Sequence, residues 1–525
     1  MSTRTVIITP APTANGDLHL GHIAGPFLAA DVHTRYARAR GREVLLGTGF
    51  QDTSTFVVTT ALRRGVRPAE LVATSAARME STLLAMGIGV DGYTGDDDRF
   101  TKWVVDFIGR LYAAGRLERR TMRFPYSERT GRFLVDGFAS GGCPECLTDG
   151  CAGLCESCGH LVAASELIGL RSTLDPDEPV VLRDAEVLVL PVERYRDRLR
   201  AHFEAYPDGM RPHMAQAMTR MLSRPLPDFP VTYPISWGIQ VPFAEFAGQV
   251  VNPNAEPMAW SMHCSALAAE SRGGATTGED ELWLAGGGSE IVYFLGFDNI
   301  YPFAIAGPAM LLAFDGRYEL PTRYLTNEFY ELDHEKFSTS RGHVVWGGEL
   351  AAEVPRDLIR FYLAATSPEH QRTSFSREAL ARVTESRLVG PWNRVADRVN
   401  HWVGHGPLPV SARSRHAAAL MSERFAASYE LDGFSLNRTA EAITDHLARL
   451  DRWPVTDADA GDFCFEVRWL LREAGPVLID LAGEALGVEA LAGEVLGVDA
   501  RTDPAEVTSI APVSLPRLVG TGAGR

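Results

Sequence analysis

The sequence is short of the features that mark secreted and membrane proteins. Its 525 residues include only seven cysteines, which suits a reducing cytosol better than a disulfide framework. The longest apolar run, 300–314, contains Pro302 and Pro308 and is too short to cross a bilayer. Because the chain starts directly with a β-branched run, we expect no signal peptide. These absences predict a cytoplasmic protein with no membrane partner.

Positive charge is also scarce. The chain carries 51 Lys and Arg against 67 Asp and Glu, which gives a formal net charge of −16 at pH 7. This sign argues against a protein that coats nucleic acid non-specifically, although it leaves room for one locally basic face. We find no internal repeat and no low-complexity tract. A chain of this length with 45% hydrophobic residues is expected to form several domains with more than one core.

One stretch near the start carries the clearest chemical pattern. Residues 5–9 are a short β-branched run typical of a buried strand, and helical spacing of apolar residues follows over 23–41. His19 and His22 therefore lie at a strand-to-helix junction, where backbone N–H groups and the helix dipole favour bound phosphate. Their rings can donate to phosphate oxygens as negative charge moves in a transition state. The alternative is a capped helix with two incidental histidines.

Four of the cysteines form two C-x-x-C pairs separated by eight residues, Cys143 with Cys146 and Cys155 with Cys158. Two such pairs at short separation supply four thiolates within reach of one Zn²⁺. Full coordination leaves no open position, so the metal would be structural rather than catalytic. Cys151 lies between the pairs and could compete as a ligand. The alternative is two redox or merely buried cysteine pairs.

The stretch around the histidines resembles the HIGH signature of class I aminoacyl-tRNA synthetases, spelled His-Leu-Gly-His here. Its continuation over 30–44, and the inserted cysteine pairs, are similar to methionyl-tRNA synthetases, and the resemblance covers nearly the whole chain. It implies an α/β chain: a Rossmann-like (HUP) class I synthetase catalytic domain with an inserted zinc-knuckle connective domain and a C-terminal α-helical bundle. It also implies an ATP-dependent ligase that forms an aminoacyl-adenylate and transfers the aminoacyl group, with ATP, Mg²⁺ and structural Zn²⁺.

The expected domain organisation combines this resemblance with the helical patterns. Patterns around 377–403, 413–430, 435–452 and 462–486 predict the helical bundle. The tail is rich in Pro, Thr and Gly and is expected to be loosely ordered. The expected segments are 1–115 and 225–350 for the two catalytic halves, 116–224 for the connective domain, 351–385 for a stem-contact linker, 386–500 for the anticodon-binding-like bundle and 501–525 for the tail.

Two further segments resemble nucleotide-binding motifs of the family. The run 290–298 resembles the segment that contacts the ATP ribose, and a carboxylate just past a strand suits ribose hydroxyls. A helix-capping Asp is the alternative. Residues 336–342 resemble the KMSKS loop, whose lysines stabilise departing pyrophosphate, but Thr339 stands where the second lysine belongs. The catalytic candidates are His19, His22 and Lys336. The expected ATP-binding residues are Ala11, Pro12, Asn15, Gly16, His19, His22, Gly296, Asp298, Lys336 and Ser338.

The expected amino-acid pocket departs from the family pattern. In methionyl-tRNA synthetases an acidic residue holds the substrate's ammonium group, and the matching position is Gln51, with Asp52 one residue later. A tryptophan of the pocket wall falls at Pro253, and a pocket histidine falls at Phe303. We therefore predict that methionine is a poor substrate. The expected pocket residues are Thr13, Gln51, Asp52, Pro253, Asn299 and Phe303.

The acyl acceptor is open at the level of sequence. Family resemblance implies tRNA, and Asn393 matches an anticodon contact. However, Asp397 stands where the family has an arginine, and an acidic side chain repels phosphate. The rival is a tRNA-independent paralogue that passes another amino acid to a small molecule in a biosynthetic pathway. A catalytically inactive tRNA-binding scaffold is a third alternative, and the retained histidines argue against it. We expect a monomer or dimer.

Overall fold

The computed structural model describes residues 4–95, 97–333, 335–337, 343–487 and 506–518. The chain divides into two compact units. The first unit comprises Met1–Leu18, Leu45–Ser81 and Val90–Glu328, and the second comprises His19–Val44, Thr82–Gly89 and Phe329–Arg525. None of the helices in the described residues combines the length and the apolarity needed to cross a membrane.

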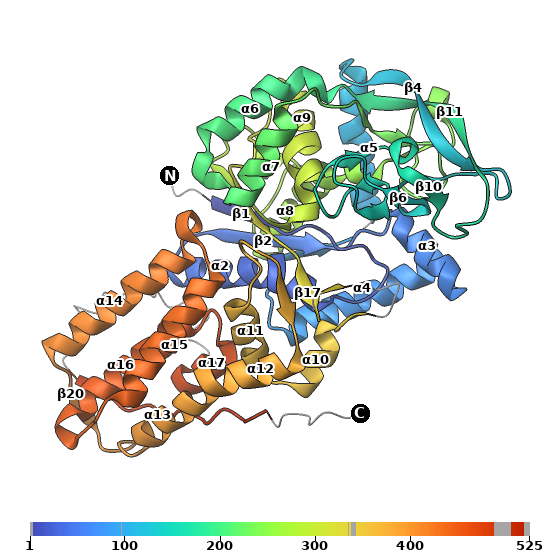
Figure 1. Ribbon diagram of the computed structural model, residues 1–525. Helices are drawn as coiled ribbons and strands as arrows, with labels where there is room; N and C mark the ends of the chain where they lie inside the picture. The colour runs from blue at the N-terminus through green and yellow to red at the C-terminus, as the bar shows by residue number, and fades with distance from the viewer. Residues whose placement is uncertain (1–3, 96, 334, 338–342, 488–505, 519–525) are drawn as a thin grey trace. The chain divides into compact units, whose positions relative to one another are not determined.

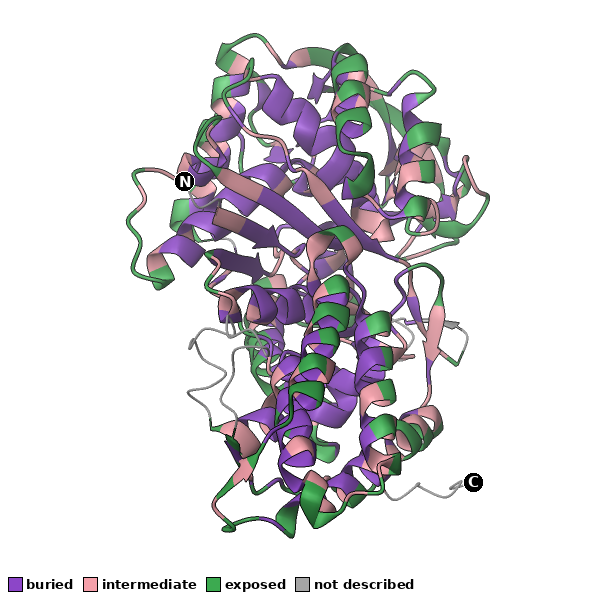
Figure 2. Ribbon diagram, turned by 90° about the vertical axis from the view of Figure 1, so that its left-hand side faces the viewer, coloured by how far each residue is buried: buried purple, intermediate pink, exposed green. Residues whose placement is uncertain are grey.

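A five-stranded parallel sheet forms the centre of the first unit. Its strand order is β16-β15-β1-β2-β3. The bounds are β1 Arg4–Ile8, β2 Val44–Gly49, β3 Gly92–Thr94, β15 Ser289–Gly296 and β16 Arg323–Asn327. In the paired registers β15 runs parallel to both β1 and β16, and β2 runs parallel to β3. The strands predicted over 5–9 and within 290–298 are confirmed as β1 and β15, and Figure 2 shows buried residues in purple.

Helices α5 (Asp98–Ala113) and α8 (Pro257–Ser271) pack against each other within this unit. The indole nitrogen of Trp103 donates to the carbonyl of Ala259 at 3.1 Å. Helix α8 is apolar around most of its circumference, as expected for a helix that is buried on all sides. It lies so close to β3 that a Cβ on Gly92 would stand 2.3 Å from the Cys264 carbonyl oxygen. Glycine is therefore required there.

Residues 116–224, which were expected to form the connective domain, contain mainly antiparallel strands followed by two helices. A four-stranded sheet of order β12-β11-β4-β5 is dominated by the pairing of β4 (Glu118–Ser127) with β11 (Val180–Leu190). Its other two strands are the short β5 (Arg132–Phe133) and β12 (Phe229–Pro230). Two hairpins carry the cysteine pairs in their turns. The first joins β6 (Ala139–Gly142) to β7 (Asp149–Cys151), and the second joins β8 (Gly153–Leu154) to β9 (Leu161–Val162). Helices α6 (Arg196–Ala205) and α7 (Pro212–Leu222) follow.

The second unit is mainly helical. Helices α14, α15 and α16 lie side by side, in orange in Figure 1. The bounds are α2 Leu28–Ala39, α11 Arg356–Ala365, α12 Arg377–Thr384, α13 Gly390–Asn400, α14 Ala412–Tyr429, α15 Leu436–Arg452, α16 Ala460–Ala474 and α17 Ile479–Leu486. The predicted helical patterns are confirmed. The first is interrupted by the π-helix η12 (Glu385–Val389), because Pro391 at the start of α13 cannot donate a helical hydrogen bond.

Part of the C-terminal tail is held against this bundle. Strand β21 (Glu506–Thr508) pairs with β20 (Pro407–Pro409), and the amide of Asn393 exchanges two hydrogen bonds with the backbone of Leu515, at 2.8 and 2.9 Å. The indole of Trp392 donates to the Val513 carbonyl at 2.9 Å. The prediction of a loosely ordered tail is therefore wrong for residues 506–518, because composition does not reveal these side-chain-to-backbone bonds.

Candidate active site

The two histidines lie at the start of a helical segment in the second unit, made of α1 (Leu20–His22), η1 (Ile23–Phe27) and α2, with a kink at Gly25. The Nδ1 of His19 accepts from the Gly21 amide at 3.1 Å, and the Nδ1 of His22 accepts from the His19 amide at 3.3 Å. A neutral imidazole that accepts at Nδ1 carries its proton on Nε2. Both rings are therefore fixed in the tautomer that donates from Nε2.

Ring stacking fixes the orientation of these imidazoles. The His19 and His22 ring centroids are 3.8 Å apart, and the Phe337 ring also stacks on His19, at 4.9 Å and an interplanar angle of 7°. A Cβ on Gly21 would stand 2.9 Å from the His19 ring. Glycine between the histidines is therefore needed for the stacked arrangement.

The described ends of the loop that resembles KMSKS also lie at these histidines. Lys336 belongs to β18 (Glu335–Lys336), which pairs with β17 (Tyr330–Leu332). Phe337 stacks on His19, and beyond the loop the Leu20 amide donates to the Val345 carbonyl at 3.1 Å. Ser338, with 339–342, lies outside the described residues. The segments flanking the loop thus contact the start of the histidine helix.

The remaining nucleotide candidates lie in the first unit. Asp298 follows the end of β15, in the short helix η9 (Phe297–Asn299), and its carboxylate accepts from the side-chain amide of Asn299 at 3.0 Å. A Cβ on Gly296 would stand 2.7 Å from the Asp298 carboxylate, so the two residues are neighbours at the carboxyl end of the strand. This is the place where open α/β sheets collect ligands.

The loop after β1 is joined to the loop after β2. The Gln51 amide donates to the Pro12 carbonyl, and the Ala14 amide donates to the Gln51 carbonyl, both at 2.8 Å. These two backbone hydrogen bonds hold the segment that contains Ala11, Asn15 and Gly16 beside the carboxyl end of β2.

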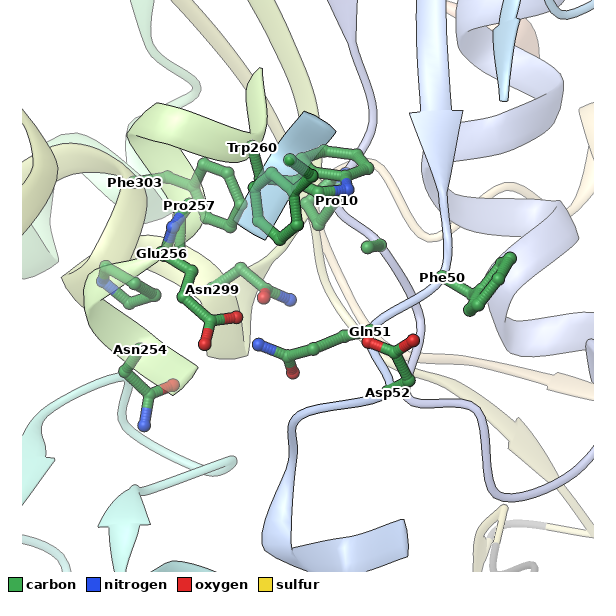
Figure 3. A pocket seen from close by; sticks show the side chains of 13 residues that line it. Pro10, Phe50, Gln51, Asp52, Asn254, Glu256, Pro257, Trp260, Asn299 and Phe303 are labelled. Atoms are coloured by element: carbon green, nitrogen blue, oxygen red, sulfur yellow. The ribbon is translucent and has the colours of Figure 1, made fainter. Parts of the chain in front are cut away.

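A pocket of about 490 Å³, including the open space at its mouth, lies in the first unit at the carboxyl ends of β1 and β2 and the start of α8. Figure 3 shows the 13 side chains that line it. They are Pro10, Ala11, Phe50, Gln51, Asp52, Phe100, Asn254, Glu256, Pro257, Trp260, Asn299, Pro302 and Phe303. The wall is therefore partly aromatic and partly polar, with two carboxylates.

Most of the residues predicted for the amino-acid pocket lie together. Gln51, Asp52, Asn299 and Phe303 line it. Thr13 and Pro253 are not among the lining residues, but both contact Gln51. Thr13 forms an isolated parallel β-bridge with Gln51, and the Pro253 carbonyl accepts a hydrogen bond from the Gln51 side-chain amide at 2.9 Å.

Sequence reasoning missed the residues that α8 contributes. Glu256 precedes the helix and is 3% exposed, and Trp260 lies one turn into it. The Thr53 hydroxyl donates to the Glu256 carboxylate at 2.7 Å. A Pro at the first helical position is a usual sign of a helix start, so Pro257 could have placed Glu256 at a helix N-terminus. Nothing in the sequence pattern places it opposite Gln51.

The four paired cysteines converge on one point in the first unit. Their sulfur atoms all lie within 4.8 Å of one another, with 3.8 Å between Cys143 and Cys158 and 3.6 Å between Cys146 and Cys155. Tetrahedral coordination with metal–sulfur bonds of about 2.3 Å separates the sulfurs by about 3.8 Å. The thiols therefore fit one tetrahedral metal ion. Cys151 is not part of this group, and burial raises the pKa of its thiol to about 11.

A family model connects these features. The model described as tRNA synthetases class I (M) matches residues 5–400. This chain belongs to that family. The match spans the histidines, the pocket and the four cysteines, so all of these features lie inside the class I (M) region.

Individual relatives agree with the family assignment. A methionine–tRNA ligase from Roseiflexus sp. (strain RS-1) is 32% identical over 416 residues, which cover 76% of this chain and 68% of the relative. One from Porphyromonas gingivalis (strain W83) is 30% identical over 471 residues, which cover 87% and 67%. The crystal structure of Mycobacterium tuberculosis methionyl-tRNA synthetase bound by methionyl-adenylate matches with a TM-score of 0.73 at 20% identity, over 98% of this chain and 99% of that one. The predicted fold class of a class I (M) synthetase is confirmed.

Proposed function

We propose that the protein activates an amino acid with ATP, forming an aminoacyl-adenylate, and transfers the aminoacyl group to tRNA, as its methionine–tRNA ligase relatives are named to do. The observation that carries the proposal is the pair of stacked histidines with Nε2 donors at the start of a helix. Such donors, fixed before the reaction, stabilise charge that develops on phosphate without any covalent step.

In this proposal the substrate carboxylate attacks the α-phosphate in line and pyrophosphate leaves. His19 and His22 donate to phosphate oxygens as the charge shifts, and Lys336 stabilises the leaving group. Asp298 accepts from the ribose hydroxyls beside Gly296. Mg²⁺ would accompany the triphosphate and neutralise part of its charge. Catalysis then consists mainly of positioning and electrostatic stabilisation.

A second candidate is transfer to a small molecule without tRNA, and one observation favours it. Asn393, which the resemblance places at an anticodon contact, has its amide bonded on both sides to the backbone of Leu515. One turn further along α13, Asp397 is exposed and acidic. An anticodon would have to displace the tail from Asn393 and approach a carboxylate, which repels phosphate.

We expect ATP–pyrophosphate exchange with at least one of the twenty amino acids, and we expect methionine not to be the best of them. Transfer of that labelled amino acid to total tRNA then decides the acceptor. Charging supports the first candidate, and exchange without charging supports the second. Exchange that is fastest with methionine would contradict the substrate prediction, and no exchange with any amino acid would contradict the proposed activity.

We further propose that the four cysteines bind one structural Zn²⁺. Four thiolate ligands would complete its coordination, so the ion would hold the two hairpin turns together and bind no substrate. The turns are preformed: the Cys143 amide donates to the Thr148 carbonyl and the Cys155 amide to the His160 carbonyl, both at 2.9 Å. All seven cysteines are free thiols, which suits the reducing cytoplasm where we place the protein.

Elemental analysis of reduced protein is expected to find one zinc per chain. Cys146→Ser is expected to lower the zinc content, because a serine hydroxyl is a poor substitute for a thiolate ligand. Cys151→Ser is the matched control and is expected to retain the metal, because its thiol lies outside the group of four. A metal-free wild-type protein, or equal loss in both variants, would contradict this assignment.

A further inference from the structure

We propose that Glu256 binds the α-ammonium group of the amino acid. This inference rests on the amino-acid activation proposed above and assigns a specificity-determining residue to its pocket. Sequence resemblance places the acidic partner of the ammonium at Gln51, which is neutral. In the structure the pocket is lined by a different carboxylate, that of Glu256, the residue immediately before α8.

The charge of the pocket indicates a cationic ligand group. Of the 13 lining residues, all of them described, the ionisable ones are Asp52 and Glu256, and both are acidic. An amino acid that uses its carboxylate to attack ATP still presents its ammonium group. A pocket with two carboxylates and a partly aromatic wall attracts that group, because opposite charges interact strongly where water is largely excluded.

Gln51 cannot replace a carboxylate in this role. Its side-chain nitrogen donates to the Pro253 carbonyl at 2.9 Å, which fixes the amide and leaves only the carbonyl oxygen as an acceptor. A neutral acceptor binds an ammonium group more weakly than a carboxylate does. The role therefore needs a carboxylate nearby, and Figure 3 shows the Glu256 side chain extending toward Gln51 beside Asn299.

Glu256 is also held in place before substrate arrives. It is 3% exposed, and the hydroxyl of Thr53, itself 3% exposed, donates to one of its carboxylate oxygens at 2.7 Å. Its position at the start of α8 places the negative charge near the positive end of the helix dipole. A rigid, buried carboxylate at a helix start loses little freedom when it binds a cation.

Asp52 is the competing carboxylate. Its side chain is partly exposed, and its backbone carbonyl accepts from the Trp237 indole at 3.0 Å. In Figure 3 the Asp52 carboxylate lies on the Phe50 side of Gln51, whereas Glu256 lies on the side of Asn299 and Phe303. The more buried of the two carboxylates has the stronger interaction with an ammonium group.

The test compares exchange kinetics for the best amino acid with those for its des-amino analogue, which has hydrogen in place of the ammonium group. Wild-type protein is expected to prefer the amino acid. In Glu256→Gln, kcat/KM for the amino acid is expected to fall about thirty-fold or more, mainly through KM, because a buried charged partner is lost. The value for the analogue and the KM for ATP are expected to stay unchanged. A glutamine oxygen still accepts from Thr53, so the variant is expected to fold.

Asp52→Asn is the matched control, and it is expected to retain the preference for the amino acid over the analogue. If Glu256→Gln retains the preference and Asp52→Asn loses it, the ammonium partner is Asp52 and the inference is overturned while the proposed function stands. If wild-type protein shows no exchange with any amino acid, the proposed function fails, and the role of Glu256 fails with it.

Discussion

Replacing His19 or His22 by alanine is expected to lower the rate of ATP–pyrophosphate exchange by about 10²–10³-fold, the usual loss when one fixed donor to a transition-state oxyanion is removed. Both rings accept at Nδ1 from backbone amides, so each contributes its Nε2 donor to the site. Because the two rings stack 3.8 Å apart, removing one also loosens the other. The double variant is therefore expected to lose less than the product of the single losses.

The measurement is exchange at saturating ATP and amino acid, together with a thermal unfolding curve. His19→Ala also removes a helix cap, which costs about 1 kcal/mol of stability, whereas His22→Ala leaves the His19 cap of Gly21 in place. The exposed His405 provides a control, and His405→Ala is expected to leave both readouts unchanged. Near-wild-type exchange in both single variants would contradict a phosphate-binding role for the pair.

The structural positions of the candidate nucleotide-binding residues could be predicted from sequence because the patterns that define them are local. His19, Gly21 and His22 lie within one turn, and Asp298 follows its strand by two residues, so strand-to-helix patterns alone locate them in the fold. The amino-acid pocket is different. Gln51 bonds to Pro253 across 202 positions of sequence, and Thr53 bonds to Glu256 across 203. Such pairings depend on how α8 packs, which periodicity does not specify.

The same distinction holds for the fold. Periodicity predicts the bundle helices, since each buries one apolar stripe. It misses the π-helix before Pro391, which is set by a single missing N–H group, and the docking of residues 506–518, which depends on Trp392 and Asn393. It also gives no sign that Arg360, a residue type usually exposed, is fully buried in the second unit.

Replacing Arg360 by methionine is expected to lower the free energy of unfolding by about 3–5 kcal/mol, the usual cost of breaking a buried ion pair on one side. Arg360 is 0% exposed and donates to the Asp31 carboxylate at 2.7 Å. It also donates to the carbonyls of Val477, Pro476 and Met86, at 2.9, 2.7 and 3.1 Å. Methionine fills a similar volume but leaves these acceptors and the carboxylate without that partner.

The pH dependence provides an independent check. Burial alone would raise the pKa of Asp31, but Arg35 and Arg360 overcome that effect and hold it below its ordinary value of 3.8. A carboxyl whose pKa is lowered by folding contributes stability above its unfolded pKa and loses it as pH falls through the folded pKa. The wild type is therefore expected to exceed Asp31→Asn in free energy of unfolding by the largest amount near neutral pH. This difference is expected to become smaller below pH 3.8.

The double variant Asp31→Asn/Arg360→Met separates the ion pair from the general effect of core substitution. If the pair is the cause, the double variant is expected to be less destabilised than the sum of the single variants, because it leaves no uncompensated buried charge. Arg35→Met is the matched control: Arg35 bonds to the same carboxylate at 2.9 Å, but its side chain is 36% exposed, so a smaller loss is expected. Urea unfolding followed by circular dichroism measures the wild type and the four variants. Strict additivity, or an equal loss in Arg35→Met, would show that the Asp31–Arg360 pair contributes nothing of its own to the stability of the second unit.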